Sequence, residues 1–214
     1  IAGATHTSIQ AAINQAVLDG YGSSNQTTIL VRPGNYTGNV ALVSGIHVTA
    51  LVGARSFSTQ ITGAVSLAAG VTSLSGVDVN ALSGDAVSVV GVTLQKQLYL
   101  AHCSVYATGT GRSAVVNVPT ASSSGLLFED VTFRIVGGGT ANAVEVVSGT
   151  IQGRTGTFWP TLQTTPSLAI NGTGALTQGR AWLAACDLFG KATVTGNGEL
   201  LLGDSQIRSG LGVC

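Results

Sequence analysis

Short runs of apolar and β-branched residues recur at a nearly constant spacing from about residue 71 onward. Each run is bounded by Gly, Asn, Ser or Asp, which are turn-forming residues. One series comprises LSGVDV, LAHCSV, LFEDVTF, GRTGTF, LAACDL and LLGDSQI, at 74–79, 100–105, 127–133, 153–158, 183–188 and 201–207. Aligning Asp78, Ser104 and Asp130 gives its first three members a period of 26 residues. Such repetition predicts a fold that stacks one structural unit.

A second series follows the first at the same period: AVSV, AVVN, AVEV, LAIN and ATVT, at 86–89, 114–117, 143–146, 168–171 and 192–195. Two interleaved series require at least two strands per repeat. The segments between them are short and rich in Gly, Ser and Asn, so they do not form crossover helices. We therefore predict an all-β fold, a single-stranded right-handed parallel β-helix whose coils stack at ~4.8 Å. An antiparallel sandwich is the alternative, although its hairpins rarely repeat one length and one local sequence.

Residues 7–20 are expected to form a short α-helix that caps this stack. Thr7-Ser8-Ile9-Gln10 has the pattern of a capping box, and Gly20 is a suitable stop. Apolar residues with helical spacing are Ile9, Ala12, Ile13, Ala16 and Val17. A helix across the open end of a β-helix covers unpaired backbone and the apolar core. We expect one domain over residues 1–214, with coils from about residue 27 to the end.

The opening of the chain also resembles a known family. SIQAAINQA at 8–16 and ILVRPGNYTGNV at 29–40 are similar to the helix, first strand and PGxY turn of the pectate-lyase-like β-helix superfamily. Within it, the chain looks most like noncatalytic phage and virion β-helix proteins. The resemblance covers nearly the whole chain and implies the fold. Enzymes and non-enzymes share this opening, so it does not select an activity.

Charge is unusually sparse along the chain. Only 8% of residues are charged, and nine acidic residues balance nine basic ones, so no long-range field favours nucleic acid or an anionic membrane. No apolar run approaches the 18 residues of a membrane span, and no signal-peptide pattern is present. We therefore expect neither nucleic acid nor a membrane as a partner.

The catalytic motifs of the superfamily are missing. Its polygalacturonase-like members carry Asp-Asp, Gly-His-Gly and Arg-x-Lys, none of which occurs in this sequence. Its lyase members gather calcium-binding carboxylates, whereas here Glu129-Asp130 is the one adjacent acidic pair. Calcium requires more oxygen ligands in one place. We assign no catalytic, metal-binding or cofactor-binding residue and expect no cofactor.

One enzymatic alternative remains, in a ladder that contains Asp78, Asp130 and Asp187. If Asp130 and Asp187 face one side two coils apart, their separation is roughly 9–10 Å, near the upper end for an inverting glycosidase. The alternative that we favour is structural: Asp and Ser satisfy backbone groups at a turn, as Ser104 does in the intervening coil.

Arginine and tryptophan residues supply candidates for a binding surface. Three arginines are expected to fall in successive coils, namely Arg134, Arg154 and Arg180. One expectation is that they line a groove for an acidic sugar, with Trp159 or Trp182 stacking on a sugar ring. The other is that they neutralise acidic residues across a protein interface. Trp159 lies in the longest coil, where an insertion is expected to project from the stack.

The histidines and cysteines carry no metal-ligand spacing. His6, His47 and His102 are far apart in sequence, and His102 adjoins Cys103, whose side chain must point to the opposite face. Cys103 and Cys186 occupy equivalent positions about three coils apart, near ~14 Å, which excludes a disulfide. We expect both to be small buried apolar residues. The odd count, with Cys214, argues against a disulfide framework.

These observations favour a noncatalytic structural role. The leading hypothesis is a virion component, a capsid decoration, cement or fibre-like subunit at the surface of a virion or extracellular assembly. Its expected partners are copies of itself, as a homotrimer, and other proteins of that assembly. The alternatives are a polysaccharide lyase or depolymerase of the tailspike type, indicated by paired outward acids, and a carbohydrate-binding adhesive module, indicated by exposed tryptophan in a groove without them.

Overall fold

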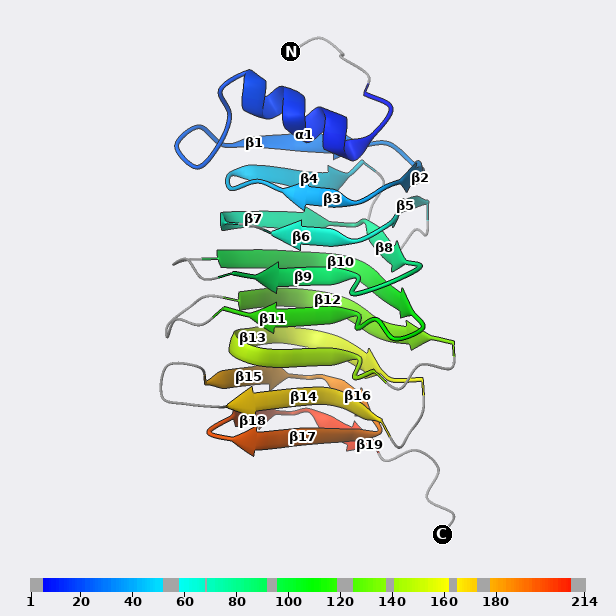
Figure 1. The fold of residues 1–214 in the computed structure, drawn as a ribbon, viewed down its shortest axis with the longest axis vertical. Helices are drawn as coiled ribbons and strands as arrows, with labels where there is room; N and C mark the ends of the chain where they lie inside the picture. The colour runs from blue at the N-terminus through cyan, green and yellow to red at the C-terminus, as the bar shows by residue number, and fades with distance from the viewer. Residues whose placement is uncertain are drawn as a thin grey trace.

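The computed structural model describes residues 6–51, 58–67, 69–91, 96–118, 125–137, 141–161, 165–172 and 178–208. Parallel strands stack in coils along the long axis, and a single helix lies across the N-terminal end (Figure 1). This confirms the predicted right-handed parallel β-helix with an N-terminal capping helix. Within the described residues, no helix is long and apolar enough to cross a bilayer.

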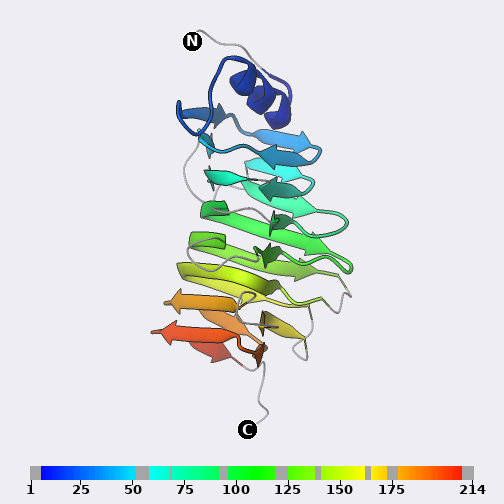
Figure 2. The same cartoon turned by 60° about the vertical axis from the view of Figure 1, so that its left-hand side comes forward.

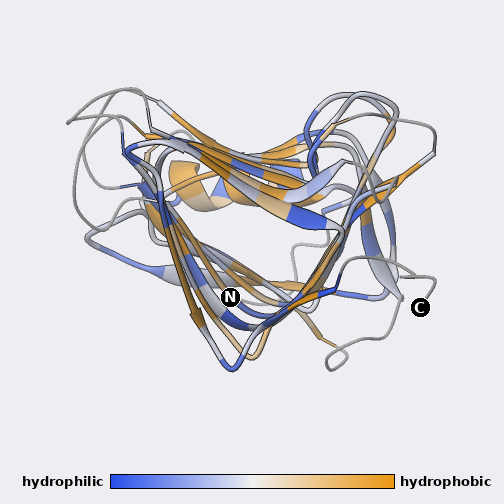
Figure 3. Cartoon of the chain, turned by 90° about the horizontal axis from the view of Figure 1, so that it is seen from below, coloured by the Kyte–Doolittle hydropathy of each residue, from blue (hydrophilic) through white to orange (hydrophobic). Residues whose placement is uncertain are grey.

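The coils have three faces, and the chain visits them in the order first, second, third (Figures 2 and 3). The first face contains β1 (Thr27–Val31), β4 (Ile46–Ala50), β7 (Gly70–Ser75), the start of β10 (Lys96–Thr108), the start of β12 (Gly125–Val136), the middle of β13 (Val144–Trp159), β15 (Gly179–Ala184) and β18 (Glu199–Gly203).

The second face contains β2 (Gly34–Thr37), β5 (Thr59–Thr62), β8 (Asp78–Ala81), the ends of β10, β12 and β13, β16 (Asp187–Phe189) and β19 (Gln206–Arg208). The third face contains β3 (Val40–Leu42), β6 (Val65–Leu67), β9 (Val87–Val90), β11 (Ala114–Asn117), the start of β13, β14 (Pro166–Gly172) and β17 (Lys191–Gly196).

The coil length varies more than the sequence pattern indicated. Leu74 pairs with Leu100, as a 26-residue period predicts, but Leu100 pairs with Phe128, 28 residues later. Ser104 consequently pairs with Thr132 and not with Asp130. The alignment of Asp130 with Asp78 and Ser104 was wrong by two residues, because this coil has one residue more before β11 and one more before β12 than the preceding coil.

The second sequence series does form the third face, with a shift of one residue in its register. Ala114 pairs with Val87 and Val144, not with Ala86 and Ala143. Because side chains alternate between the two sides of a strand, such a shift changes which residues point inward. The third-face core is a ladder of inward side chains, Val65, Val87, Ala114, Val144 and Leu168, all fully buried.

Between the first and second faces the chain turns at one residue in the left-handed backbone region. In successive coils this residue is His102, Asp130 and Thr155, with φ of 53°, 53° and 56°. Only glycine adopts this region without strain, so the recurrence of other residues here shows that stacking imposes the corner. Asp130 therefore belongs to the corner, whereas Thr132 takes the strand position.

The helix α1 (Ile9–Leu18) buries Ile9, Ile13 and Ala16 against the first coils. Its N-cap is Ser8, whose hydroxyl accepts from the amide of Ala11 at 3.1 Å, so the predicted capping box beginning at Thr7 was placed one residue too early. The Gln10 side chain instead accepts from the backbone amide of Ala41 on the third face, at 2.7 Å, and ties the helix to the stack.

Candidate functional site

A groove of about 890 Å³ lies on the outer surface of the first face and crosses β10, β12, β13, β15 and β18. Strand register explains its composition, because outward residues at one position of each strand form a line along the axis. That line is Tyr99, Leu127, Gln152, Trp182 and Leu201. Two flanking lines contribute further polar lining residues, Gln97, Thr150 and Arg180 on one side and Glu129 and Arg154 on the other.

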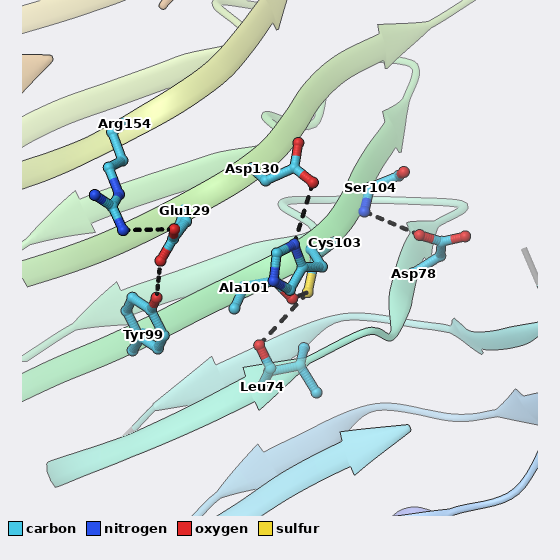
Figure 4. Close-up of polar contacts among 10 residues, drawn as sticks. Leu74, Asp78, Tyr99, Ala101, Cys103, Ser104, Glu129, Asp130 and Arg154 are labelled. Carbon is cyan, nitrogen blue, oxygen red and sulfur yellow. Dashed lines mark hydrogen bonds and ion pairs between the residues drawn. The ribbon is translucent and has the colours of Figure 1, made fainter. Parts of the chain in front are cut away.

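One end of the groove is organised around Glu129 (Figure 4). The hydroxyl of Tyr99 donates to Glu129 Oε2 at 2.8 Å, and Arg154 Nη2 donates to Glu129 Oε1 at 2.7 Å. The hydrogen bond from Tyr99 and then the Arg154 guanidinium lower the pKa of the Glu129 carboxyl. Burial, followed by the hydrogen bond to Glu129, raises the pKa of Tyr99. The carboxylate is therefore ionised and held by two donors at neutral pH.

The other end of the groove has a second ion pair. Arg180 Nε lies 3.4 Å from Glu199 Oε2, and its Nη2 donates to Gln178 Oε1 at 2.9 Å. Trp182 stands between the two ion pairs with 38% of its surface exposed. Each arginine of the groove is thus matched by a carboxylate, and the groove has no net charge from these four groups.

Asp78, Asp130 and Asp187 do not form the single ladder on which the enzymatic alternative depended. Asp78 is buried and its Oδ1 accepts from the Ser104 amide at 2.9 Å, which is the structural role that we favoured. Asp130 stands at the corner, 3.1 Å from His102 Nδ1 (Figure 4), and Asp187 pairs with Arg208 at 3.0 Å. Neither Asp130 nor Asp187 lines the groove, and they belong to different ladders.

The two carboxylates associated with the groove also lie far apart. Glu129 is in β12 and Glu199 is in β18, three coils further along the first face. Three strand spacings alone separate them by ~14 Å. Glycosidase carboxylates stand roughly 5–9.5 Å apart, so these two do not form such a pair.

The structure divides the arginines and tryptophans between two faces. Arg154, Arg180 and Trp182 meet in the first-face groove, as one hypothesis required. Arg134 and Trp159 lie on the second face, where the Arg134 guanidinium is 5.7 Å from the Trp159 ring centroid. Trp159 ends β13 and stacks on Phe189, so its expected projection from the stack is not observed.

The histidines lie in separate parts of the stack, and the two described cysteines are buried in its core. His47 Nδ1 lies 2.9 Å from the Ser73 hydroxyl, and His6 borders the cleft between α1 and β1. Cys103 and Cys186 are buried free thiols at equivalent positions, as expected, and Cys214 lies outside the described residues. Across the described ranges, His, Cys, Asp and Glu side chains nowhere gather in threes, so they offer no metal site.

Sequence reasoning missed four polar residues of the groove, Gln97, Tyr99, Thr150 and Gln152. A signal for two of them was present, because Tyr99 and Gln152 occupy the same position of the repeat as Trp182. Finding them required the true register of each coil, which the variable coil lengths obscured.

The chain matches no family model and no curated protein by sequence. Solved structures share its fold. Pectin methylesterase PemA from Erwinia chrysanthemi superposes with a TM-score of 0.54 at 12% identity, over 90% of this chain and 78% of that one. Pectin methylesterase from Yersinia enterocolitica gives 0.50 at 11% identity, over 98% and 92%.

A viral protein, ORF18 of Geobacillus virus E2, is also similar, with a TM-score of 0.48 at 13% identity. It is aligned over 94% of this chain and 55% of its own length. The two methylesterase structures show that the chain shares their fold, a parallel β-helix, and at such low identity activity depends on the residues of each surface.

Proposed function

We propose that this chain is a noncatalytic carbohydrate-binding β-helix whose first-face groove holds the glycan. One observation carries the proposal: Trp182 is exposed at the centre of an open groove, between the ion pairs of Arg154 with Glu129 and of Arg180 with Glu199. Sugar rings present apolar C–H faces that pack on indole, while planar polar side chains receive their hydroxyls.

The charges of the groove indicate the class of sugar. Arg154 and Arg180 already face carboxylates, so an acidic sugar would compete with Glu129 and Glu199 for them. A neutral glycan needs no such exchange, because its hydroxyls both donate and accept and can join existing ion pairs. The proposed ligand is therefore a neutral oligosaccharide, which differs from the acidic sugar that the arginines alone suggested.

Calorimetric titration of the intact chain tests this function. The probes are cellohexaose, laminarihexaose, maltohexaose and hexagalacturonate. We expect one neutral hexasaccharide to bind, and Trp182→Ala to weaken that binding by about tenfold or more, since an aromatic contact contributes of the order of 1–2 kcal/mol. Trp159→Ala is the matched control, because Trp159 lies on another face.

Three outcomes would contradict the proposal. They are binding of none of the neutral sugars, equal binding by the Trp182→Ala variant, and release of new reducing ends during incubation. The last would show catalysis and restore the depolymerase alternative.

A second candidate function is a structural subunit of a virion or other extracellular assembly, such as a decoration, cement or fibre-like protein. The sparse charge supports it, together with large aliphatic side chains exposed on each flat face, Val71 on the first, Val136 on the second and Val90 on the third. Such faces are suited to packing against copies of the chain, in a homotrimer, and against neighbouring proteins.

Native mass spectrometry and co-purification with particles test the assembly role. We expect a trimeric mass and retention of the chain on assembled particles. A monodisperse monomer that co-purifies with no particle would contradict it.

A further inference from the structure

The second face carries a continuous ladder of planar side chains. Tyr106 pairs with Arg134, Arg134 with Trp159, and Phe189 with Arg208, each in the next coil. The Trp159 and Phe189 rings close the gap, since they stack with centroids 4.3 Å apart and an interplanar angle of 18°. We call these five residues the second-face ladder.

Two arginines enclose the stacked rings. The Arg134 guanidinium lies 5.7 Å from the Trp159 centroid, and that of Arg208 lies 5.7 Å from the Phe189 centroid. Cation–π contacts of this kind hold a guanidinium in place while leaving its N–H donors free to bind. The ladder therefore presents oriented donors on a rigid sheet.

The Trp159 ring has little free face on which a sugar could stack. Trp159 has Phe189 against it on one side and Arg134 near its ring in the neighbouring coil. It is nevertheless 45% exposed, so what it offers to solvent is largely its edge. An exposed aromatic edge beside arginine is a composition enriched at the energetic centres of protein interfaces.

The net positive charge of the second-face ladder favours a partner that carries negative charge. Arg208 is paired with Asp187 at 3.0 Å, whereas no carboxylate of the described residues lies within ion-pairing distance of Arg134. The surface thus carries one positive charge beyond its own pairs. A second copy that met this ladder across a two-fold axis parallel to the stack would bring Arg134 against Arg134, which is repulsive.

We propose that the second-face ladder docks an acidic, extended segment of a partner protein. A carboxylate of that segment binds the Arg134 guanidinium, and apolar side chains cover the Trp159 edge. Arg134 and Arg208 are three coils apart, ~14 Å, close to the ~13 Å that four residues of an extended strand span. An acidic residue at one position therefore meets the unpaired Arg134, and a second one four residues on comes within reach of Arg208, where it shares the guanidinium with Asp187. This inference does not depend on glycan binding, which uses another face.

Fluorescence anisotropy of the intact chain tests the docking. The probe is a fluorescein-labelled peptide, Glu-Leu-Thr-Leu-Glu, and its control is Gln-Leu-Thr-Leu-Gln. We expect the acidic peptide to bind, the control to bind at least about fivefold more weakly, and R134Q and W159A each to weaken the acidic peptide by a similar factor. Arg32→Gln removes the same charge from an exposed site at the N-terminal end and should leave binding unchanged.

Several results would overturn the proposal. Absence of acidic-peptide binding at peptide concentrations up to about 1 mM, the weak end of the affinity scale, is one. Equal binding by wild type and R134Q is another. A smaller sedimentation mass for unliganded R134Q would identify a second copy as the occupant, and binding of hexagalacturonate that requires Arg134 would identify an acidic glycan. Trp182→Ala should not affect peptide binding, which separates this test from that of the groove.

Discussion

Arg112 holds Asp85 with two parallel hydrogen bonds, from Nε to Oδ1 at 2.8 Å and from Nη2 to Oδ2 at 2.7 Å. The two residues precede β11 and β9, so the pair joins successive coils where the chain enters the third face. Arg112 Nη1 also donates to Glu145 of the next coil, at 2.7 Å. One side chain therefore links three coils.

We predict that Arg112→Gln lowers the free energy of unfolding at pH 7 by about 1–3 kcal/mol, because it removes charge-assisted hydrogen bonds and leaves two carboxylates side by side. Glu145→Gln, which keeps the Asp85 contact, should cost less. Urea denaturation measures both. Equal stability of Arg112→Gln and wild type would show that the pair contributes nothing.

The packing of Phe128 against the next coil gives a second prediction. A methyl group added at Gly156 would lie 2.5 Å from the Phe128 ring, and its other close neighbours are also side-chain atoms. Gly156→Ala should therefore destabilise the protein by about 1–3 kcal/mol, and Phe128→Leu in the same chain should relieve much of that cost.

Gly153 supplies the matched comparison. A methyl group there would lie 2.5 Å from the Phe128 ring and also 2.5 Å from the Phe128 carbonyl oxygen. Trimming the ring cannot move the carbonyl, so Phe128→Leu should rescue Gly153→Ala poorly. Thermal denaturation of the two double variants checks this, and equal rescue at both positions would refute the assigned contacts.

Asp78 provides a prediction on pH. Burial raises the pKa of its carboxyl above the ordinary value, despite hydrogen bonds from Ser104. The native state then holds this proton to higher pH than the unfolded chain, so stability declines as the pH rises through the folded pKa. Asp78→Asn keeps an acceptor for the Ser104 amide and has no charge to bury. Its free energy of unfolding, relative to that of wild type, should therefore increase as the pH rises from 3 to 7.

Asp85 is the internal control for that measurement. Burial opposes its ionisation, but the hydrogen bonds and charge of Arg112 prevail and lower the pKa of Asp85. Its contribution is present above the unfolded pKa and is lost as the pH falls through the folded one, so Asp85→Asn should lose stability relative to wild type over the same rise in pH. Calorimetry at pH 3 and pH 7 measures the stability of each variant relative to wild type. If the two differences change in the same direction with pH, the opposite pKa shifts of Asp78 and Asp85 are contradicted.

The thiol of Cys103 should be inert in the folded protein. Burial raises its pKa from 9.0 to about 12, which lowers the thiolate fraction at pH 8 by about a thousandfold. In a variant with Cys186→Ser and Cys214→Ser, which leaves Cys103 as the one thiol, reaction with Ellman's reagent is expected to be slow until urea unfolds the chain. Fast labelling of the native protein would show that Cys103 is accessible.

The sequence by itself determined the architecture. Alternating apolar and turn residues at a nearly fixed period specify stacked strands, and the opening helix was evident from its apolar spacing, because both patterns are local consequences of burying one side of an element. The same reasoning identified Cys103 and Cys186 as buried equivalents and separated His102 from Cys103.

Only the tertiary structure decided the register, and with it the surfaces. Two residues more in one coil moved Asp130 from the strand ladder to the corner, and the boundary between faces separated Arg134 from Arg154. The physical reason is that coil length sets the place of each residue: two extra residues move a side chain from strand to corner, and a shift of one residue exchanges inward and outward side chains. Trp182 lines a groove because of its neighbours Gln152 and Leu201, and Trp159 stacks on Phe189. These neighbours lie one coil away, and the local sequence does not specify them.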